Sequence, residues 1–164
     1  MGPIVVELYP DKAPATVENF VQYVRDGHFN GTVFHRVIPN FMIQGGGFAS
    51  DMREKPTRGP VKSEAGNGLR NAAGTLAMAR TPDPHSASAQ FFINLADNAF
   101  LDFKAPTASG YGYTVFGKVV SGMDVVMKIA AVRTGPRPPH DDVPLKPVVI
   151  EGARLVGGPA PTSK

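Results

Sequence analysis

Alternating hydrophobic and polar residues predict a series of short strands along this chain. Residues 4–8, with the sequence IVVEL, place hydrophobic side chains at every second position and end at a Tyr-Pro-Asp turn. Runs of β-branched and aromatic residues, each bounded by Pro, Gly, Asn or Asp, predict further strands at 32–38, 41–44, 75–79, 90–95, 114–120 and 147–156. Strands of this length and number are typical of a mainly β protein.

Two segments have helical spacing instead. The first starts at Pro14 and is followed by Gly27, which provides a stop. Its hydrophobic residues recur at three- and four-residue intervals: Val17, Phe20, Val21 and Val24. The second follows Ser121, a suitable N-cap, and repeats the pattern with Met123, Val126, Met127 and Ala130. We therefore expect two amphipathic helices far apart in the sequence.

The remaining segments connect these elements. We expect the polar residues 48–72 to form an ordered surface loop, the proline-rich residues 134–147 to form another loop, and residues 157–164 to be a flexible C-terminal tail. Residues 1–156 are predicted to be a single domain. The absence of regular strand–helix alternation argues against a doubly wound parallel sheet. It favours an antiparallel sheet or closed barrel whose ends are covered by the two helices.

Composition and charge narrow the function classes. The 164 residues suit one domain, and a net charge of +3 is too small to suggest nucleic-acid binding. A nucleic-acid-associated protein would have only one basic run in its favour, Arg53, Lys55, Arg58 and Lys62, which a solvated loop also explains. No apolar stretch is long enough to span a membrane. The N-terminal residues do not resemble a secretory leader, so we expect a cytoplasmic protein, or a periplasmic one if an upstream signal peptide was removed.

Common catalytic motifs are missing from the sequence. There is no cysteine, the four histidines (His28, His35, His85 and His140) lack metal-ligand spacing, and no GxSxG motif marks a serine nucleophile. Gly45, Gly46 and Gly47 do not fit a phosphate-binding loop, and close backbone packing is the simpler interpretation. We therefore expect neither a metal nor a cofactor.

The most distinctive segment is residues 34–46, with the sequence FHRVIPNFMIQGG. Successive strand residues point to opposite faces, so His35 and Arg36 should diverge. Near Arg36 the segment combines one cation with apolar and amide side chains, which is unusual for a core. The pattern alone leaves two readings open: Arg36 as a solvated strand charge with Phe41 and Met42 in the core, or all three as parts of a site.

This segment resembles the signature of the cyclophilins, the cyclophilin-type peptidyl-prolyl cis-trans isomerases. Further similar segments follow in the same order along the chain: APATVENF at 13–20, GTLAMAR at 74–80, SAQFFIN at 88–94 and VFGKVV at 115–120. NGLRN at 67–71 and DNAFLD at 97–102 resemble the bacterial branch most. The resemblance covers about residues 4–156 and implies a closed eight-stranded antiparallel β-barrel capped by two α-helices.

The resemblance also implies roles for individual residues. Arg36 would be the catalytic cation, Gln44 would contact the substrate amide, and the proline pocket would consist of Phe41, Met42, Phe92 and Leu101. The rest of the peptide groove would be lined by Ile38, Ala79, Arg80, Gln90, Phe100 and Tyr113, with His35 adjacent. Substrates would be proline-containing peptides and unfolded or folding proteins, and we expect a monomer that binds neither nucleic acid nor membranes.

These residue types suit the isomerisation of a prolyl bond. The barrier of about 18–20 kcal/mol comes from amide resonance, and no covalent bond is broken. An enzyme therefore needs to bind the twisted amide more tightly than either planar form. An arginine can donate hydrogen bonds to the proline nitrogen as it pyramidalises, or to the neighbouring carbonyl, while an apolar pocket holds the ring.

Three positions depart from the common family pattern, and one alternative function remains. Many family members carry tryptophan at Phe100, histidine at Tyr113 and asparagine at Arg80. Phenylalanine lacks the indole N–H donor, so we expect weak binding of the macrocycle cyclosporin. The alternative to an isomerase is a non-catalytic proline-peptide-binding module or holdase chaperone that uses the same groove.

Overall fold

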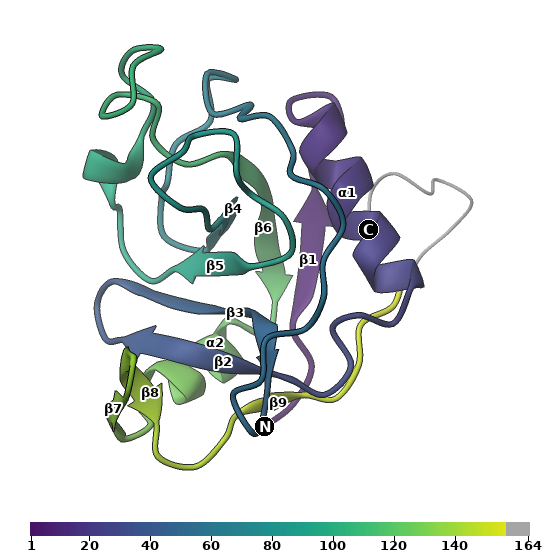
Figure 1. The fold of residues 1–164 in the computed structure, drawn as a ribbon, viewed down its shortest axis with the longest axis vertical. Coiled ribbons are helices and arrows are strands. Elements are labelled where there is room, and N and C mark those ends of the chain that lie inside the picture. The colour runs from purple at the N-terminus through teal and green to yellow at the C-terminus, as the bar shows by residue number, and fades with distance from the viewer. Residues whose placement is uncertain (157–164) are drawn as a thin grey trace.

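A computed structural model describes residues 1–156 of the chain, so the predicted C-terminal tail at 157–164 lies outside the described residues. Seven strands form one antiparallel sheet with the order β1-β6-β4-β5-β3-β2-β9 (Figure 1). Their bounds are β1 Val5–Leu8, β2 Thr32–Ile38, β3 Met42–Ala49, β4 Thr75–Met78, β5 Phe91–Asn94, β6 Val115–Ser121 and β9 Val149–Ile150. A separate two-stranded ribbon consists of β7 Thr134–Arg137 and β8 His140–Pro144.

The large sheet is strongly curled, but within residues 1–156 it does not close. Its edge strands, β1 and β9, pair with β6 and β2 and not with each other. β9 contains only two residues, and Pro147 just before it has no N–H group to extend the pairing. The predicted mainly β fold is confirmed, whereas a closed eight-stranded barrel is not.

Two α-helices accompany the sheet, as predicted. α1 spans Pro14–Arg25 beside β1, and α2 spans Met123–Ala130 and packs against β2 and β3 (Figure 1). Ser121 is not the N-cap of α2, because it is the last residue of β6 and Gly122 occupies the cap with a φ of 91°. This left-handed conformation, which glycine adopts readily, lets the chain pass from strand to helix within one residue. Within residues 1–156, no helix has the length and apolar character needed to cross a membrane.

Two other expectations from the sequence were wrong. Residues 134–147 are not an irregular loop, since most of them form the β7–β8 ribbon, in which Thr134 pairs with Pro144 and Arg137 with His140. Proline is tolerated there because each strand of an isolated ribbon leaves one edge unpaired. β3 does not end before the glycines but runs through all three of them. A Cβ on Gly45 would lie 2.8 Å from the carbonyl oxygen of Val33, so glycine permits the close approach of β2 to β3.

The polar segment 48–72 is ordered, as expected, because its backbone and side chains bond to α1. The backbone N–H of Arg58 donates to the hydroxyl oxygen of Tyr23 (2.8 Å), and the carboxylate of Glu64 accepts hydrogen bonds from the backbone N–H and the hydroxyl of Thr16 (2.8 and 2.7 Å). The segment thus crosses the surface in a fixed path.

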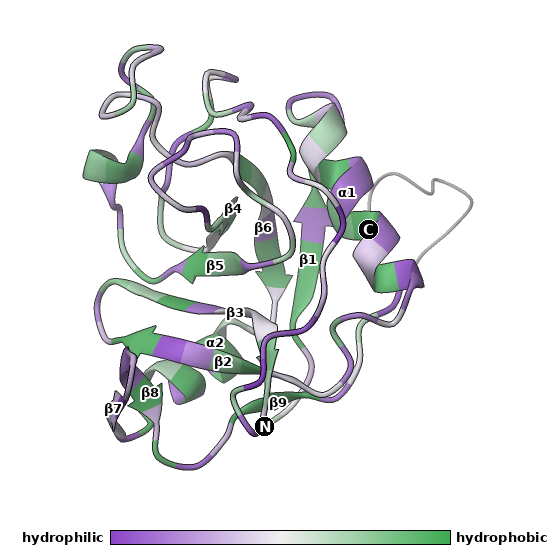
Figure 2. Cartoon of the chain, viewed as in Figure 1, coloured by the Kyte–Doolittle hydropathy of each residue, from purple (hydrophilic) through white to green (hydrophobic). Residues whose placement is uncertain are grey.

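The pleat of the sheet separates two hydrophobic clusters. Residues of one row, Val37, Ile43, Ile93 and Leu76, pair across β2, β3, β5 and β4, and their side chains are buried in the main core with α1 and α2. The adjacent row is Arg36, Gln44, Phe92 and Ala77, and it faces the other way. On this second face a smaller cluster forms from Met42, Ala77, Phe92, Leu101 and Val115. Figure 2 shows β2 as hydrophobic at both ends with one hydrophilic stretch between.

Candidate active site

The second face of the sheet carries a pocket of about 160 Å³. The residues around it come from β2, the turn between β2 and β3, β3, β5, the segment after β4, the short 3₁₀ helix η1 (Ala99–Leu101) and the segment before β6. They are Arg36, Phe41, Met42, Gln44, Ala79, Arg80, Phe92, Leu101 and Tyr113. All nine are among the residues that the sequence resemblance assigned to the site.

The base of the pocket is apolar and tightly packed. Met42, Phe92 and Leu101 are 1%, 4% and 9% exposed, and the ring of Tyr113 meets that of Phe92 edge-on, with centroids 5.7 Å apart. Phe41 and Ile38 are partly buried against the same cluster. This arrangement creates a hydrophobic hollow of the kind that accepts a small aliphatic ring.

Arg36 lines the same pocket and, unlike the residues of the base, is exposed to solvent, so it lies at the mouth of the hollow. Its Nη1 donates a long hydrogen bond (3.5 Å) to Oε1 of Gln44, and its Cζ lies 6.0 Å from the ring centroid of Phe41. Gln44 is in turn fixed because its Nε2 donates to Oε1 of Gln90 (2.9 Å). Gly47 makes room for Gln90, since a Cβ there would lie 2.5 Å from the glutamine side chain. The glycine run thus supports a chain of contacts that ends at the guanidinium.

Arg80 lines the pocket beside Tyr113. Its guanidinium lies over the ring of Tyr113, with Cζ 4.4 Å from the centroid. Nε and Nη2 both donate to the carbonyl oxygen of Gly112 (3.0 and 2.8 Å), and Nη1 donates to that of Thr81 (2.8 Å). Arg80 is therefore held in place on two sides.

Four residues assigned to the site by resemblance do not line the pocket. Gln90 lies behind Gln44, and Ile38 packs against the hydrophobic cluster. Phe100 is 67% exposed at the rim, where its ring stacks on Phe41 with centroids 5.7 Å apart. His35 is the clear exception, because it is 5% exposed and contacts Phe48 and His140 on the side of the β7–β8 ribbon.

Irregular pairing and burial define the environment of His35. The register of β2 with β3 shifts on both sides of Phe34, and Nδ1 of His35 has no hydrogen-bond partner among the described residues. Burial, followed by the nearby His140 and Arg36, lowers the pKa of His35 to about 4. The imidazole is therefore neutral in the folded protein near pH 7.

This burial predicts a pH-dependent stability. The folded state takes up fewer protons than the unfolded chain between the ordinary histidine pKa of about 6.5 and a pKa of about 4, so stability falls as the pH is lowered through that range. From pH 7.5 to pH 5 we expect His35 to account for a loss of about 2 kcal/mol in the free energy of unfolding. Urea titrations at both pH values, on the protein and on His35→Phe, measure it.

The His35→Phe comparison is needed because burial also lowers the pKa of His28. The variant should retain the contribution of His28 and lose that of His35. Equal losses of stability in the protein and the variant would contradict the assignment.

A buried network of asparagines supports the pocket, and no sequence pattern predicts it. Asn71, Asn94 and Asn98 are almost fully buried. Nδ2 of Asn98 donates to the carbonyl oxygen of Phe41 (2.9 Å) and to Oδ1 of Asn94 (2.8 Å), and Nδ2 of Asn71 donates to the carbonyl oxygen of Leu101 (3.1 Å). Nδ2 of Asn94 donates to Oδ1 of Asn71 (3.1 Å), which closes the network. Two walls of the pocket, at Phe41 and Leu101, therefore depend on the same set of amides.

Removing one of these amides should disturb the pocket. Asn98→Ala removes one of the two hydrogen bonds to the carbonyl oxygen of Phe41 and the hydrogen bond to the buried Oδ1 of Asn94, so we expect the free energy of unfolding to fall by about 1–3 kcal/mol. Peptide affinity should fall as well, because the Phe41 wall loses one of the hydrogen bonds that hold it. Asn19→Ala is the matched control, since Asn19 also donates to a backbone carbonyl (Ser88, 2.7 Å) but from α1. Equal peptide affinities in the two variants would show that the network does not position the pocket.

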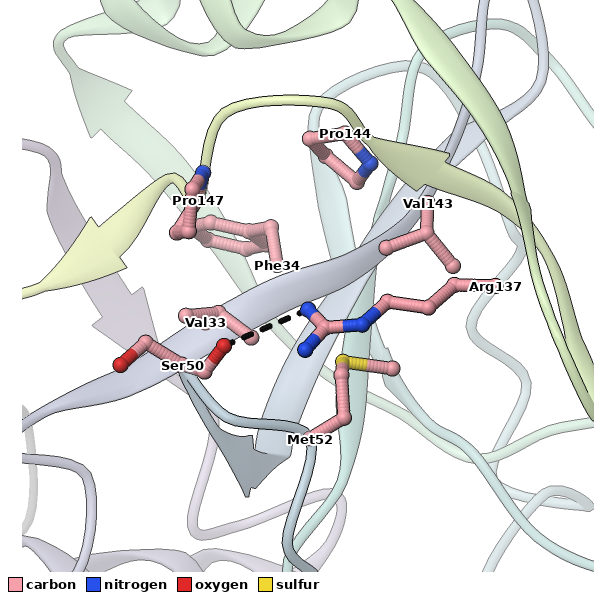
Figure 3. A pocket seen from close by; sticks show the side chains of 8 residues that line it. All are labelled: Val33, Phe34, Ser50, Met52, Arg137, Val143, Pro144 and Pro147. Carbon is pink, nitrogen blue, oxygen red and sulfur yellow. Dashed lines mark hydrogen bonds between the residues drawn. The ribbon is translucent and has the colours of Figure 1, made fainter.

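A second cavity lies between β2 and the β7–β8 ribbon (Figure 3). Its volume is about 10 Å³, which is room for roughly one water molecule. Arg137 reaches across it, and its Nη1 donates to the carbonyl oxygen of Ser50 (3.4 Å). This cavity joins the ribbon to the sheet and is too small for a peptide. Within residues 1–156, no three or more His, Cys, Asp and Glu side chains gather as a metal-binding group.

Comparisons with known proteins show which family the chain belongs to. The family model described as cyclophilin type peptidyl-prolyl cis-trans isomerase/CLD matches residues 1–155. The chain is 60% identical to peptidyl-prolyl cis-trans isomerase cyp18 of Streptomyces antibioticus over 95% of its length and 94% of the relative's. It is 58% identical to peptidyl-prolyl cis-trans isomerase B of Escherichia coli (strain K12), over 94% of each chain.

A solved structure supports the same fold. The crystal structure of a Cryptosporidium parvum cyclophilin type peptidyl-prolyl cis-trans isomerase has a TM-score of 0.76 at 23% identity, covering 96% of this chain and 93% of that one. The curled sheet with its two helices is therefore a cyclophilin fold. With the family model matching almost the whole chain and bacterial relatives at such identity, this chain belongs to the cyclophilin-type peptidyl-prolyl cis-trans isomerases, as a bacterial-type member.

Proposed function

We propose that the pocket binds the proline ring of an X-Pro peptide and that Arg36 stabilises the twisted amide, so that the chain catalyses the cis–trans isomerisation of its family. The observation that carries this proposal is the position of the guanidinium at the mouth of the hollow formed by Met42, Phe92 and Leu101. The substrates would be proline-containing peptides and segments of folding proteins, and the protein would act as a monomer.

The chemistry needs no nucleophile. The nitrogen of a planar amide is a poor hydrogen-bond acceptor because its lone pair is delocalised into the carbonyl. As the bond twists, the nitrogen regains its lone pair, so a donor at that position stabilises the twisted state more than the planar ones. The apolar walls hold the ring while the rest of the peptide rotates, and the bound ring displaces water from the hollow beside Arg36.

The free donor capacity of Arg36 favours catalysis over binding alone. Its one side-chain hydrogen bond, to Gln44, is 3.5 Å long, and residues 1–156 contain a single ion pair, Arg58–Asp26, in which it takes no part. A module that only held proline peptides would have its apolar hollow and would not require an unpaired cation at its mouth. The holdase alternative explains the pocket but not this residue.

Exchange NMR on a proline peptide distinguishes the two functions. With the protein at a small fraction of the peptide concentration, an isomerase produces exchange between the cis and trans resonances. Without a catalyst, this interconversion takes tens of seconds or longer at 25 °C. A binding module shifts or broadens the resonances at stoichiometric protein and leaves the interconversion rate unchanged. Binding without faster interconversion would contradict the proposed function.

The exposed rim at Phe100 predicts weak cyclosporin binding. Phe100 stacks on Phe41 and offers no hydrogen-bond donor, whereas tryptophan at this position would add an indole N–H. We expect Phe100→Trp to bind cyclosporin about three- to tenfold more tightly, the value of one hydrogen bond. Calorimetric titration of both proteins measures this difference. Tight binding by the unaltered protein, or no gain in the variant, would contradict the prediction.

A further inference from the structure

We propose that Arg80, together with Arg36, makes this site prefer peptides that carry an acidic residue within two positions of the proline. The inference rests on the proposed function and concerns which proline peptides are isomerised fastest. It assigns Arg80 a role in specificity that is separate from the catalytic role of Arg36.

The charged residues that line the pocket are both cationic. Of the nine lining residues, Arg36 and Arg80 are cationic and none is acidic. Within residues 1–156 the only ion pair is Arg58–Asp26, so neither pocket arginine has a carboxylate within 4.0 Å. A peptide carboxylate would therefore meet two uncompensated positive charges.

The acidic residue next to the pocket wall in sequence, Asp102, forms no ion pair with Arg36 or Arg80. Asp102 follows Leu101, and its Oδ1 accepts hydrogen bonds from the backbone N–H and the side-chain Nδ2 of Asn71 (2.7 and 3.2 Å). It is thus engaged in the asparagine network. Close by, Nζ of Lys104 lies near the carbonyl oxygens of Ala99, Phe100 and Asp102, which adds positive charge at the same rim.

Arg80 is held only by neutral groups, so its contacts do not compensate its positive charge. Its partners are the neutral carbonyls of Gly112 and Thr81 and the face of Tyr113. Three of its five N–H groups donate to these carbonyls, which leaves two for a ligand. Because these contacts already restrict the side chain, little rotamer entropy remains to be lost when it meets a carboxylate.

The expected preference is modest because the pocket is open to water. A charge pair a few ångströms apart at a protein surface changes an equilibrium about three- to tenfold, and salt weakens it. We therefore expect kcat/KM for a Glu peptide to exceed that for the matched Gln peptide by about three- to tenfold at low ionic strength. A matched Lys peptide should fall below the Gln peptide, and both differences should shrink in about 1 M salt.

The test must separate the effect of the positive charge of Arg80 from the effect of its packing, since Arg80 also packs on Tyr113 in the wall of the pocket. We would measure kcat/KM for prolyl peptides with Glu, Gln or Lys at each of the two positions on either side of the proline. The Glu/Gln and Lys/Gln ratios cancel a general loss of activity, because the Gln peptide reports damage to the wall. The proteins compared are the unaltered chain, Arg80→Met, Arg80→Lys and the charge control Lys128→Gln on α2.

The proposal predicts a distinct outcome for each protein. Arg80→Met should bring both ratios close to one at the position nearest Arg80, whatever happens to the Gln peptide. Arg80→Lys should keep the ratios while losing activity on all peptides, and Lys128→Gln should match the unaltered protein. Ratios unchanged in Arg80→Met, or near one in the unaltered protein at every position, would overturn the proposal while leaving the proposed function intact. Failure to isomerise any peptide would overturn both.

Discussion

Arg36→Ala should lower kcat for a prolyl peptide by about 10²- to 10³-fold, the usual loss when one preorganised donor to a transition state is removed. The dissociation constant for the same peptide should change only a few-fold. The side chain is exposed and makes one long hydrogen bond, to Gln44, so its removal should leave the fold and the hollow unchanged. A protease-coupled isomerisation assay gives the rate, and calorimetry gives the affinity.

Arg36→Lys sharpens the interpretation. Lysine keeps the charge but cannot present the planar fork that reaches a nitrogen and a neighbouring carbonyl together. We expect its rate to lie between those of the protein and Arg36→Ala. An Arg36→Ala variant with undiminished turnover, or one whose entire loss appears in affinity, would be incompatible with a transition-state role.

Phe92→Ala should have the second large effect, on both stability and binding. The ring is 4% exposed, and it lies in the sheet between Gln44 on β3 and Ala77 on β4. Its removal should lower the free energy of unfolding by about 3–5 kcal/mol. Peptide affinity should fall strongly as well, because the base of the proline pocket is lost. Chemical denaturation and calorimetry at a temperature where the variant is folded measure the two effects.

The adjacent residue supplies the control. Phe91 is also buried, but it faces the main core, where it meets Phe20 and Phe29 edge-on. Phe91→Leu and Phe92→Leu remove similar volume from opposite faces of β5 and are milder than the alanine variants. Both should be destabilised, and only Phe92→Leu should bind peptide more weakly. Equal peptide affinity in the two leucine variants would show that Phe92 is not part of the proline pocket.

Local sequence signals were enough for the elements that follow simple rules. The strand at 32–38 and the helix starting at Pro14 agree with the structure. Runs of β-branched residues and the three- and four-residue spacing of hydrophobic residues directly indicate which side chains are buried. The β7–β8 ribbon was missed because prolines indicate a loop unless the sequence reveals an isolated pair of strands with free edges. The sequence pattern predicts a strand end at the glycines of β3, since their close contacts with Val33 and Gln90 are tertiary.

The candidate site was predictable only through family resemblance. Alternation places Arg36 and His35 on opposite faces, but it cannot show that His35 is buried beside His140, and the resemblance implies only a position adjacent to the groove. The asparagines were missed because Asn71, Asn94 and Asn98 are far apart or in different segments, and only the fold brings their amides together. Likewise, the stacking of Arg80 on Tyr113 depends on how two loops meet.

The most direct test of the role of Arg36 is the rate at which a bound peptide isomerises. Exchange NMR at saturating protein measures this rate independently of affinity, for the unaltered chain and for Arg36→Ala. We predict that interconversion of the bound peptide slows by at least about 10²-fold in the variant while the bound cis and trans populations stay similar. Equal rates of bound interconversion in the two proteins would contradict the account.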